Sequence, residues 1–266
     1  MVIADIIVPL FVPAHRPERF AKAAAAHPDA VILDLEDAVP AEAKEAARAA
    51  MNCAFTDLPV LVRVNAAGTA WHAADLAAVA RLQPAAVLLP KAEDFNVVSR
   101  VADAVGPVPV VALMETARGL AVARALAAHP AVARLAFGSV DYCADLGCAH
   151  VPEALFAARS ELVLASRLSG LPAPIDGVTT ALDDAAAAAD DARRARTLGL
   201  GGKLAIHPRQ IAPIRTGFAP DATEIAWAER VLASGAGAVS VDGSMVDEPV
   251  RIRARAILAR RGGAAG

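Results

Sequence analysis

Short apolar runs alternate with longer Ala-, Leu- and Arg-rich segments along most of this chain. The eight apolar runs begin at Ile6, Ala30, Val60, Ala85, Pro109, Val132, Pro172 and Gly202. The segments with helical patterning cover residues 17–27, 41–54, 71–82, 94–105, 117–128, 152–169, 183–198 and 222–234. A buried strand followed by an amphipathic helix is typical of a parallel βαβ unit. Eight such units predict an α/β fold of the (β/α)8 TIM-barrel type in preference to an open doubly wound sheet.

The chain is long enough for one barrel and a C-terminal extension. A (β/α)8 barrel takes about 250 residues, and the chain has 266. We place the barrel over residues 1–237 and the extension over residues 238–266. Asp242-Gly243 predicts a turn, and a final helix is expected to begin near Glu248 or Pro249 with Asp247 as its N-cap. We expect this extension to pack on or near a neighbouring protomer's site.

Composition excludes several classes of protein. No uninterrupted run of 18 apolar residues is present, which argues against a transmembrane helix, and we expect a cytoplasmic protein with no membrane partner. A net charge of −3 and 4% aromatic residues argue against a nucleic-acid partner. The cysteines Cys53, Cys143 and Cys148 are too few for a disulfide framework, and we interpret them as packing residues.

Polar side chains follow each of the eight predicted strands. They are Arg16, Asp34, Glu36, Asp37, Arg63, Asn65, Lys91, Glu115, Asp141, Asp176 and His207. Any one of them could be a helix cap or an ion-pair partner. The carboxyl ends of barrel strands meet at one mouth, however, so these groups are expected to converge there.

This set of side chains is suited to a divalent cation. Two carboxylates from neighbouring strands, with water in the remaining positions, would suit Mg²⁺. Further acids such as Glu36 and Asp37 could hold the cation's waters, and a nearby arginine could bind a carboxylate through two hydrogen bonds. Such an ion acts as a Lewis acid on a 2-oxo group or an enolate. The histidines and cysteines do not have the spacing of a zinc site.

Nine segments of this sequence form a recognisable order. They are LFVPAHRPERFAKA, AVILDLEDAVPAEAKEAAR, LVRVNA, LLPKAED, LMETARGL, FGSVDYCADLG, PIDGV, GKLAIHPRQI and DGSMVDEPV. With these segments, nearly the whole chain resembles the HpcH/HpaI aldolase and citrate lyase β-subunit superfamily, in its CitE-like CoA-ester lyase branch. The resemblance implies a (β/α)8 barrel that forms a homotrimer or a dimer of trimers. It also implies a Mg²⁺-dependent carbon–carbon lyase that joins or separates a 2-oxo acid and an acyl-CoA thioester.

The resemblance assigns roles to residues of the predicted mouth. The metal-binding acids are Glu115 in METARG and Asp141 in GSVDYCADLG. The arginine that binds substrate and acts in catalysis is Arg63 in VRVN, and the second-strand acids on the substrate side are Glu36 and Asp37 in LEDAV.

Three further residues receive roles from the resemblance. Arg16 and Lys22 are expected to face CoA. Asp247 in GSMVDEP matches a tail aspartate that acts as acid or base in the site of an adjacent protomer. The competing interpretation of Asp247 is a cap of its own helix. Tyr142 and Cys143 depart from the small apolar residues that usually follow the sixth-strand aspartate, and we expect them to reshape the acyl pocket.

Three other functions remain open from the sequence. One is a class II aldolase that acts on a free hydroxy-oxo acid. Another is a citrate lyase β-subunit that works on citryl-acyl carrier protein, and the third is a barrel without activity. Lys91 as a Schiff-base lysine is disfavoured because the metal acids already supply an electron sink. Asp34 and His207 are interpreted as structural, and Asp176 is left undecided.

Overall fold

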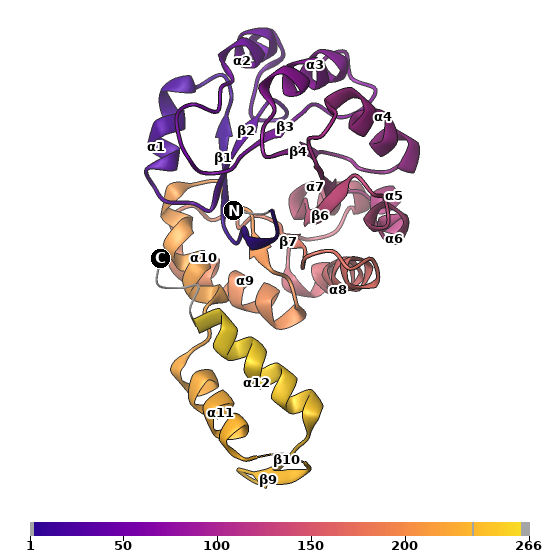
Figure 1. Cartoon of the computed structure of the whole chain (residues 1–266). Helices are drawn as coiled ribbons and strands as arrows, with labels where there is room; N and C mark the ends of the chain where they lie inside the picture. The colour runs from indigo at the N-terminus through magenta and orange to yellow at the C-terminus, as the bar shows by residue number, and fades with distance from the viewer. Residues whose placement is uncertain (1–2, 236, 262–266) are drawn as a thin grey trace.

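The computed structural model describes residues 3–235 and 237–261. Its main sheet has eight parallel strands in the sequential order β1 to β8 (Figure 1). The strands are β1 Pro9–Pro13, β2 Ala30–Asp34, β3 Val60–Arg63, β4 Ala86–Leu89, β5 Val110–Met114, β6 Val132–Phe137, β7 Ile175–Asp176 and β8 Gly202–Lys203. A parallel bridge between Leu10 and Ala205 joins the last strand region to the first. The predicted (β/α)8 barrel is therefore confirmed.

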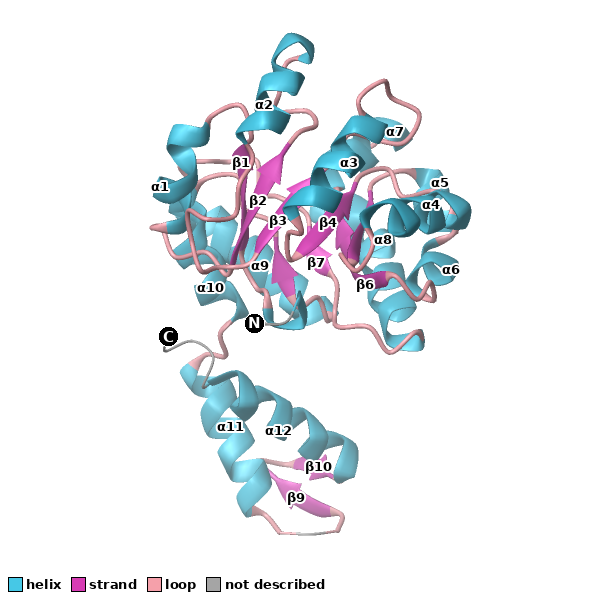
Figure 2. Cartoon of the chain, turned by 45° about the horizontal axis from the view of Figure 1, so that its top comes forward, coloured by secondary structure: helices cyan, strands magenta, loops and turns pink. Residues whose placement is uncertain are grey.

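Helices surround this sheet, as Figure 2 shows. They are α1 Phe20–Ala24, α2 Lys44–Ala50, α3 His72–Leu82, α4 Phe95–Val105, α5 Ala117–Ala121, α6 Ala123–Ala127, α7 Ser139–Leu146, α8 Pro152–Leu168, α9 Ala185–Leu198 and α10 Ile211–Phe218. Short 3-10 turns cover η1 Ile3–Asp5, η2 Pro17–Arg19, η3 Ala41–Ala43 and η4 Pro208–Gln210. None of the helices within residues 3–235 and 237–261 is long and apolar enough to cross a bilayer.

The sequence missed the short helix that follows the sixth strand. Residues 138–141 were expected to continue the sixth strand, but β6 ends at Phe137 and α7 begins at Ser139. Gly147 ends α7 in the left-handed conformation, and its N–H donates to the carbonyl of Cys143. A helix of this length shows too few periodic positions to be read from the sequence.

Strand alternation divides the core into two layers. One face of the strands points into the barrel and carries Ile32, Leu61, Val111 and Leu113. The other face packs against the surrounding helices. Because side chains two residues apart share a face, Glu115 lies on the same side of its strand as Leu113, where the barrel interior opens to the mouth.

The C-terminal segment forms an arm with its own small core. It consists of α11 Ala222–Ala233, the hairpin β9 Val239–Val241 and β10 Ser244–Val246, and α12 Glu248–Arg261. Its buried residues are Ala228, Val231, Val246, Ala254 and Ile257. Figures 1 and 2 show the arm projecting from the barrel.

This arm begins earlier than the boundary at residue 237 that the sequence predicted. The helix over 222–234 was expected to be the eighth barrel helix, but α10 takes that place and α11 packs on α12 instead. Arg260 of α12 lines a cavity together with Ile7 and Asp29, which precede β1 and β2. The arm therefore meets the barrel at the end opposite the mouth.

A buried charge network ties the last two strands to their helices. Arg159 of α8 donates to both carboxylate oxygens of Asp176, at 2.8 and 2.9 Å. Lys203 Nζ lies 3.1 Å from Asp176 and 2.7 Å from Asp191 of α9. Asp176, Lys203 and Arg159 are all buried, so Asp176 is a structural group rather than a ligand of the mouth.

This network generates a stability prediction. Lys203→Met leaves buried carboxylates short of a partner, and we expect it to lower the free energy of unfolding by about 3 kcal/mol. The control is Arg193→Ala, which removes a half-exposed ion pair with Asp190 and should cost less than about 1 kcal/mol. Urea denaturation measures both values. Equal small losses in the two variants would contradict the structural role of Lys203.

Candidate functional site

A pocket of about 480 Å³ opens at the carboxyl ends of the strands. Its acidic and basic lining residues are Asp34, Asp37, Arg63, Glu115 and Asp141. Its apolar wall comes from Phe11, Leu113, Phe137, Val178, Leu204 and Ile206. The pocket therefore combines a few charged groups with hydrocarbon surface, as small-molecule sites commonly do.

Glu115 is a deeply buried acid of this pocket. It follows β5 directly, and only 1% of its surface is exposed. Its Oε1 accepts the backbone N–H of Lys91 at 2.8 Å. Burial, with the nearby charges of Glu36 and Asp141, raises the pKa of Glu115 to about 8. A carboxyl group under this repulsion is stabilised in its ionised form by a bound cation.

Asp141 reaches the pocket from a helix and not from a strand. It lies in the first turn of α7, and it lines the same pocket as Glu115. Gly138 makes room for the Glu115 side chain, because a Cβ there would lie 2.4 Å from Glu115 Oε2. The hydroxyl of Ser139 meets His150 Nε2 at 2.9 Å, which ties the start of α7 to the loop after it. The structure thus brings together the two predicted metal acids.

Arg63 is held by three acids. Its Nε and Nη2 each donate to Asp34 at 2.7 Å. Its Nη1 lies 3.0 Å from Glu36 and 3.6 Å from Asp37. Although burial by itself lowers the pKa of Arg63, these carboxylates raise it above its usual range. The ring of Phe11 lies 4.9 Å from the guanidinium carbon. Asp34 is therefore structural, as predicted, and Arg63 is fixed in place at the pocket wall.

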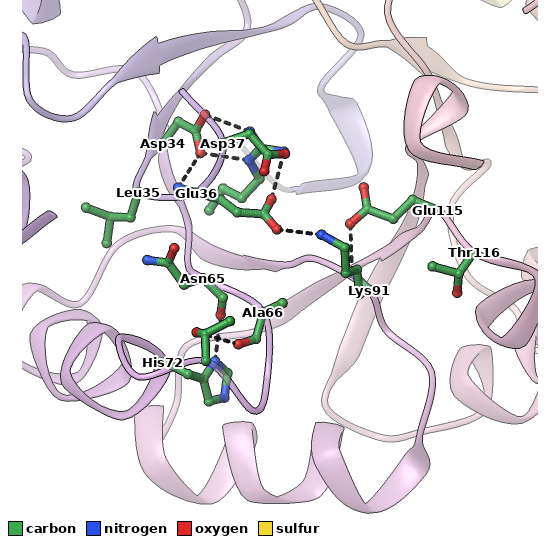
Figure 3. Close-up of polar contacts among 12 residues, drawn as sticks. Asp34, Leu35, Glu36, Asp37, Asn65, Ala66, His72, Lys91, Glu115 and Thr116 are labelled. Carbon is green, nitrogen blue, oxygen red and sulfur yellow. Dashed lines mark hydrogen bonds and ion pairs between the residues drawn. The ribbon is translucent and has the colours of Figure 1, made fainter. Parts of the chain in front are cut away.

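Glu36 lies between two cations (Figure 3). Its Oε2 faces Arg63, and its Oε1 accepts from the ammonium of Lys91 at 3.1 Å. Burial raises the pKa of Glu36 above its ordinary value, while Arg63 and Lys91 oppose that effect. Asp37 is more exposed and makes the longer contact with Arg63.

The predicted CoA-facing residues lie outside the pocket. Arg16 pairs with Glu18 at the start of η2, and Lys22 is an exposed residue of α1. Neither lines the pocket of Glu115 and Asp141. Their roles toward CoA remain predictions.

Asp247 is not brought to the mouth of its own chain. It precedes α12 in the arm, and its Oδ1 accepts the N–H of Val250 at 3.4 Å, which is an N-cap contact. The helix-capping interpretation therefore agrees with the structure. A catalytic role for Asp247 requires a second chain and stays a prediction.

Tyr142 and Cys143 do not reshape the acyl pocket. Both side chains are buried in the layer between sheet and helices, and Tyr142 packs edge-on against Phe137. Because Asp141 is helical, the two residues after it turn away from the mouth. The expectation drawn from these two substitutions was wrong.

The residues at the mouth suit a hydrated divalent cation. Glu115 and Asp141 are two carboxylates in one pocket, with Oε2 of Glu115 directed toward Gly138. Within the described ranges 3–235 and 237–261, no three His, Cys, Asp or Glu side chains form a group that could hold a metal ion by themselves. Mg²⁺ keeps several waters and takes one or two carboxylates, so this donor set fits it better than a site with many protein ligands.

Two features of the mouth were missed at the level of sequence. Lys91 has a left-handed backbone, with φ of 46°, and no sequence rule marks a lysine for that conformation. A glycine is required at position 138 because a Cβ there would clash with the side chain of Glu115, which follows a different strand. The LPKAED and FGSVD segments contain these residues, but only their three-dimensional contacts reveal what they do.

The pKa of Glu115 predicts a pH-dependent cation affinity. Below pH 8 the carboxyl mostly carries a proton, which a cation must displace. We expect the affinity for Mg²⁺ to rise by about tenfold from pH 6 to pH 7, because the ionised fraction rises by that factor, and to level off above pH 9. Calorimetry in two buffers with different ionisation enthalpies measures both the affinity and the released proton. A flat affinity with no proton released contradicts the buried, protonated state of Glu115.

The chain is similar to known proteins over nearly its full length. A citrate lyase subunit beta-like protein of Deinococcus radiodurans is 39% identical, with 94% of this chain and 95% of the relative covered. A (3S)-malyl-CoA thioesterase of Cereibacter sphaeroides is 34% identical, with 94% and 93% covered. The solved structure of protein CitE from Mycobacterium tuberculosis, in complex with magnesium, acetoacetate and coenzyme A, has a TM-score of 0.89. It is 38% identical and covers 98% of this chain and 100% of that chain.

A match to one family extends over residues 8–208, from the start of β1 to the turn after β8. These residues include every side chain of the mouth described above. The chain therefore belongs to the HpcH/HpaI aldolase/citrate lyase family.

Proposed function

We propose that this chain is a Mg²⁺-dependent carbon–carbon lyase of the CitE-like type. It cleaves a hydroxyacyl-CoA thioester to a 2-oxo acid and an acyl-CoA, or forms it from them. The observation that carries the proposal is the pair Glu115 and Asp141 in one half-apolar pocket beside the fixed guanidinium of Arg63. Complexes of the related CitE protein support the cation and the ligands: one contains magnesium, acetoacetate and coenzyme A, and another contains magnesium and the 2-oxo acid pyruvate.

Glu115 and Asp141 would hold the cation. When bound, Mg²⁺ supplies Lewis-acid stabilisation to a 2-oxo group or an enolate oxygen. The hydrogen bond from the Lys91 backbone holds one oxygen of Glu115 and leaves the other directed into the site. Ser139 and His150 hold the start of the helix that carries Asp141.

Arg63 would bind the carboxylate of the oxo acid. Its contacts with Asp34 are short and bidentate, whereas its contact with Asp37 is 3.6 Å long. The Asp37 carboxylate is also 59% exposed, so it can move away with little loss of packing. A substrate carboxylate can then take its place at Nη1, with the guanidinium already oriented by Asp34.

The apolar wall would protect the reacting carbons. Phe11, Phe137 and Val178 line the same pocket as the acids. Their hydrocarbon surface keeps water away from an enolate and strengthens the charge–charge interactions inside the pocket.

Asp247 of an adjacent protomer would handle the proton of the enolate. The arm projects from its own barrel (Figure 1), and Asp247 does not line the pocket of its own mouth. This part of the proposal includes a homotrimer or a dimer of trimers, in which one arm reaches the next mouth. A cytoplasmic location also remains part of the proposal, and cell fractionation tests it.

A thioester panel tests the activity. We expect Mg²⁺-dependent cleavage of at least one of malyl-, citramalyl-, 3-hydroxy-3-methylglutaryl- and citryl-CoA by the purified chain. Glu115→Gln should lower kcat by at least about a hundredfold, because the cation that stabilises the transition state is lost. The release of the oxo acid is measured by coupled reduction. Full activity in Glu115→Gln would falsify the metal assignment.

The same panel separates the alternative functions. Activity on free hydroxy-oxo acids without CoA would point to a class II aldolase. Activity only on citryl-acyl carrier protein, with co-purifying carrier and transferase subunits, would identify a citrate lyase β-subunit.

Mixing two inactive variants tests the shared site. Asp247→Asn and Glu115→Gln each inactivate every mouth of their own oligomer if Asp247 acts in trans. Subunits of the two variants exchanged into mixed trimers should recover part of the wild-type activity, because some mouths combine an intact Glu115 with a neighbour's intact Asp247. The control is a mixture of Arg63→Met with Glu115→Gln. Arg63 and Glu115 both belong to the mouth of their own barrel, so every mouth in this mixture lacks one of the two residues. Equal activity in the two mixtures would show that Asp247 does not act across chains.

A further inference from the structure

Lys91 has an unusual backbone at the edge of the mouth. It follows β4 after Pro90, and its φ of 46° lies in the left-handed region that favours glycine. A lysine in this conformation costs conformational energy, and such residues persist where the surrounding structure needs them. The contacts of Lys91 indicate what that need is.

Lys91 binds two acids through two different groups. Its backbone N–H donates to Glu115 Oε1 at 2.8 Å. Its ammonium lies 3.1 Å from Glu36 Oε1. Rotation about φ sets the angle between the N–H and the side chain of a residue, so the left-handed value lets both groups point to their acids. Figure 3 shows Lys91 between the two carboxylates.

Glu36 has the capacity to bind a further cation. It is 6% exposed, and its Oε2 has no hydrogen-bond partner although Arg63 lies 3.0 Å away. Its charge also acts on Glu115, because it contributes to the raised pKa of that carboxyl. Glu36 is therefore a third carboxylate beside the site of Glu115 and Asp141, and the ammonium of Lys91 occupies its other oxygen.

We propose that Lys91 is a positioning residue that limits the cation site to two protein carboxylates and so makes it prefer Mg²⁺ to Ca²⁺. Its ammonium keeps Glu36 away from the cation site, while its N–H orients Glu115 in that site. Mg²⁺ retains its waters and needs few carboxylates, whereas Ca²⁺ accepts six to eight oxygens and gains from each additional carboxylate. This inference rests on the proposed function, since it concerns the same cation site.

The restriction has a consequence for the reaction. A third carboxylate on the ion would reduce its positive charge and fill a position that an oxo acid needs. Keeping Glu36 away leaves both the Lewis acidity and the open positions of the ion to the substrate.

Cation titrations on substituted proteins test the proposal. Mg²⁺ and Ca²⁺ are titrated by calorimetry into the cation-free protein, and the readout is the ratio of Kd for Ca²⁺ to Kd for Mg²⁺. Loss of a positive charge tightens binding of any divalent cation, and the ratio cancels that general effect. We expect Lys91→Met to lower the ratio at least tenfold, because Glu36 becomes free to bind Ca²⁺. Lys91→Arg keeps the charge and should stay within threefold of the wild-type ratio.

Two further variants separate the charge from the backbone. Lys91→Gly keeps the N–H and favours the left-handed conformation, so it should fold well and lower the ratio as Lys91→Met does. The double variant Glu36→Gln with Lys91→Met removes the third carboxylate and should restore the ratio to within threefold of wild type. Thermal melting confirms that each variant is folded.

The possible failures are distinguishable. If all variants keep the wild-type ratio while the wild type binds Mg²⁺, the role of Lys91 is refuted and the proposed function stands. If the double variant retains the lowered ratio, Glu36 is not the competing ligand and the proposal is again overturned. If the wild type binds neither ion, both the proposed function and this inference fail.

Discussion

The hydrogen bonds that close the sheet are the constraint on which the site depends. The N–H of Phe11 donates to Ala205 at 2.9 Å, and the N–H of Ala205 donates to Pro9 at the same distance. They join the first strand to the segment after the last one. Closure brings residues that are far apart in sequence around one mouth, and it is reinforced on the last two strands by the buried network of Asp176 and Lys203.

Charge repulsion is the second organising force at this mouth. Four acids line the pocket and a fifth, Glu36, lies just behind them. The cations divide them into groups. Arg63 forms ion pairs with Asp34, Glu36 and Asp37. The negative charges of Glu115 and Asp141 repel each other and are less well neutralised. The raised pKa of Glu115 is the consequence, and a divalent cation is the ligand that relieves it.

The acids that line the mouth therefore have different tasks although they have similar chemistry. Asp34 orients Arg63 through both oxygens and also accepts the backbone N–H of Glu36, and Glu36 is shared between Arg63 and Lys91. Asp34 and Glu36 differ from the candidate ligands Glu115 and Asp141 only in their contacts with Arg63 and Lys91. Gly138 contributes by leaving space for the Glu115 side chain. Lys91 contributes through its left-handed backbone, which directs its N–H to Glu115.

The sequence by itself determined the barrel and the strands that carry the polar groups, and its resemblance to a known family singled out Glu115 and Asp141 as candidate ligands. Periodicity is a local property, and strand ends of a closed parallel sheet must meet, so these conclusions needed no coordinates. Only the tertiary structure decided the partners. It placed Asp141 on a short helix, turned Tyr142 and Cys143 into the core, assigned Arg63 to three acids and gave residues 222–233 to the arm. Each of these outcomes depends on contacts between segments that are distant in the sequence. The local sequence around an apolar face or a carboxylate does not indicate which group it will contact.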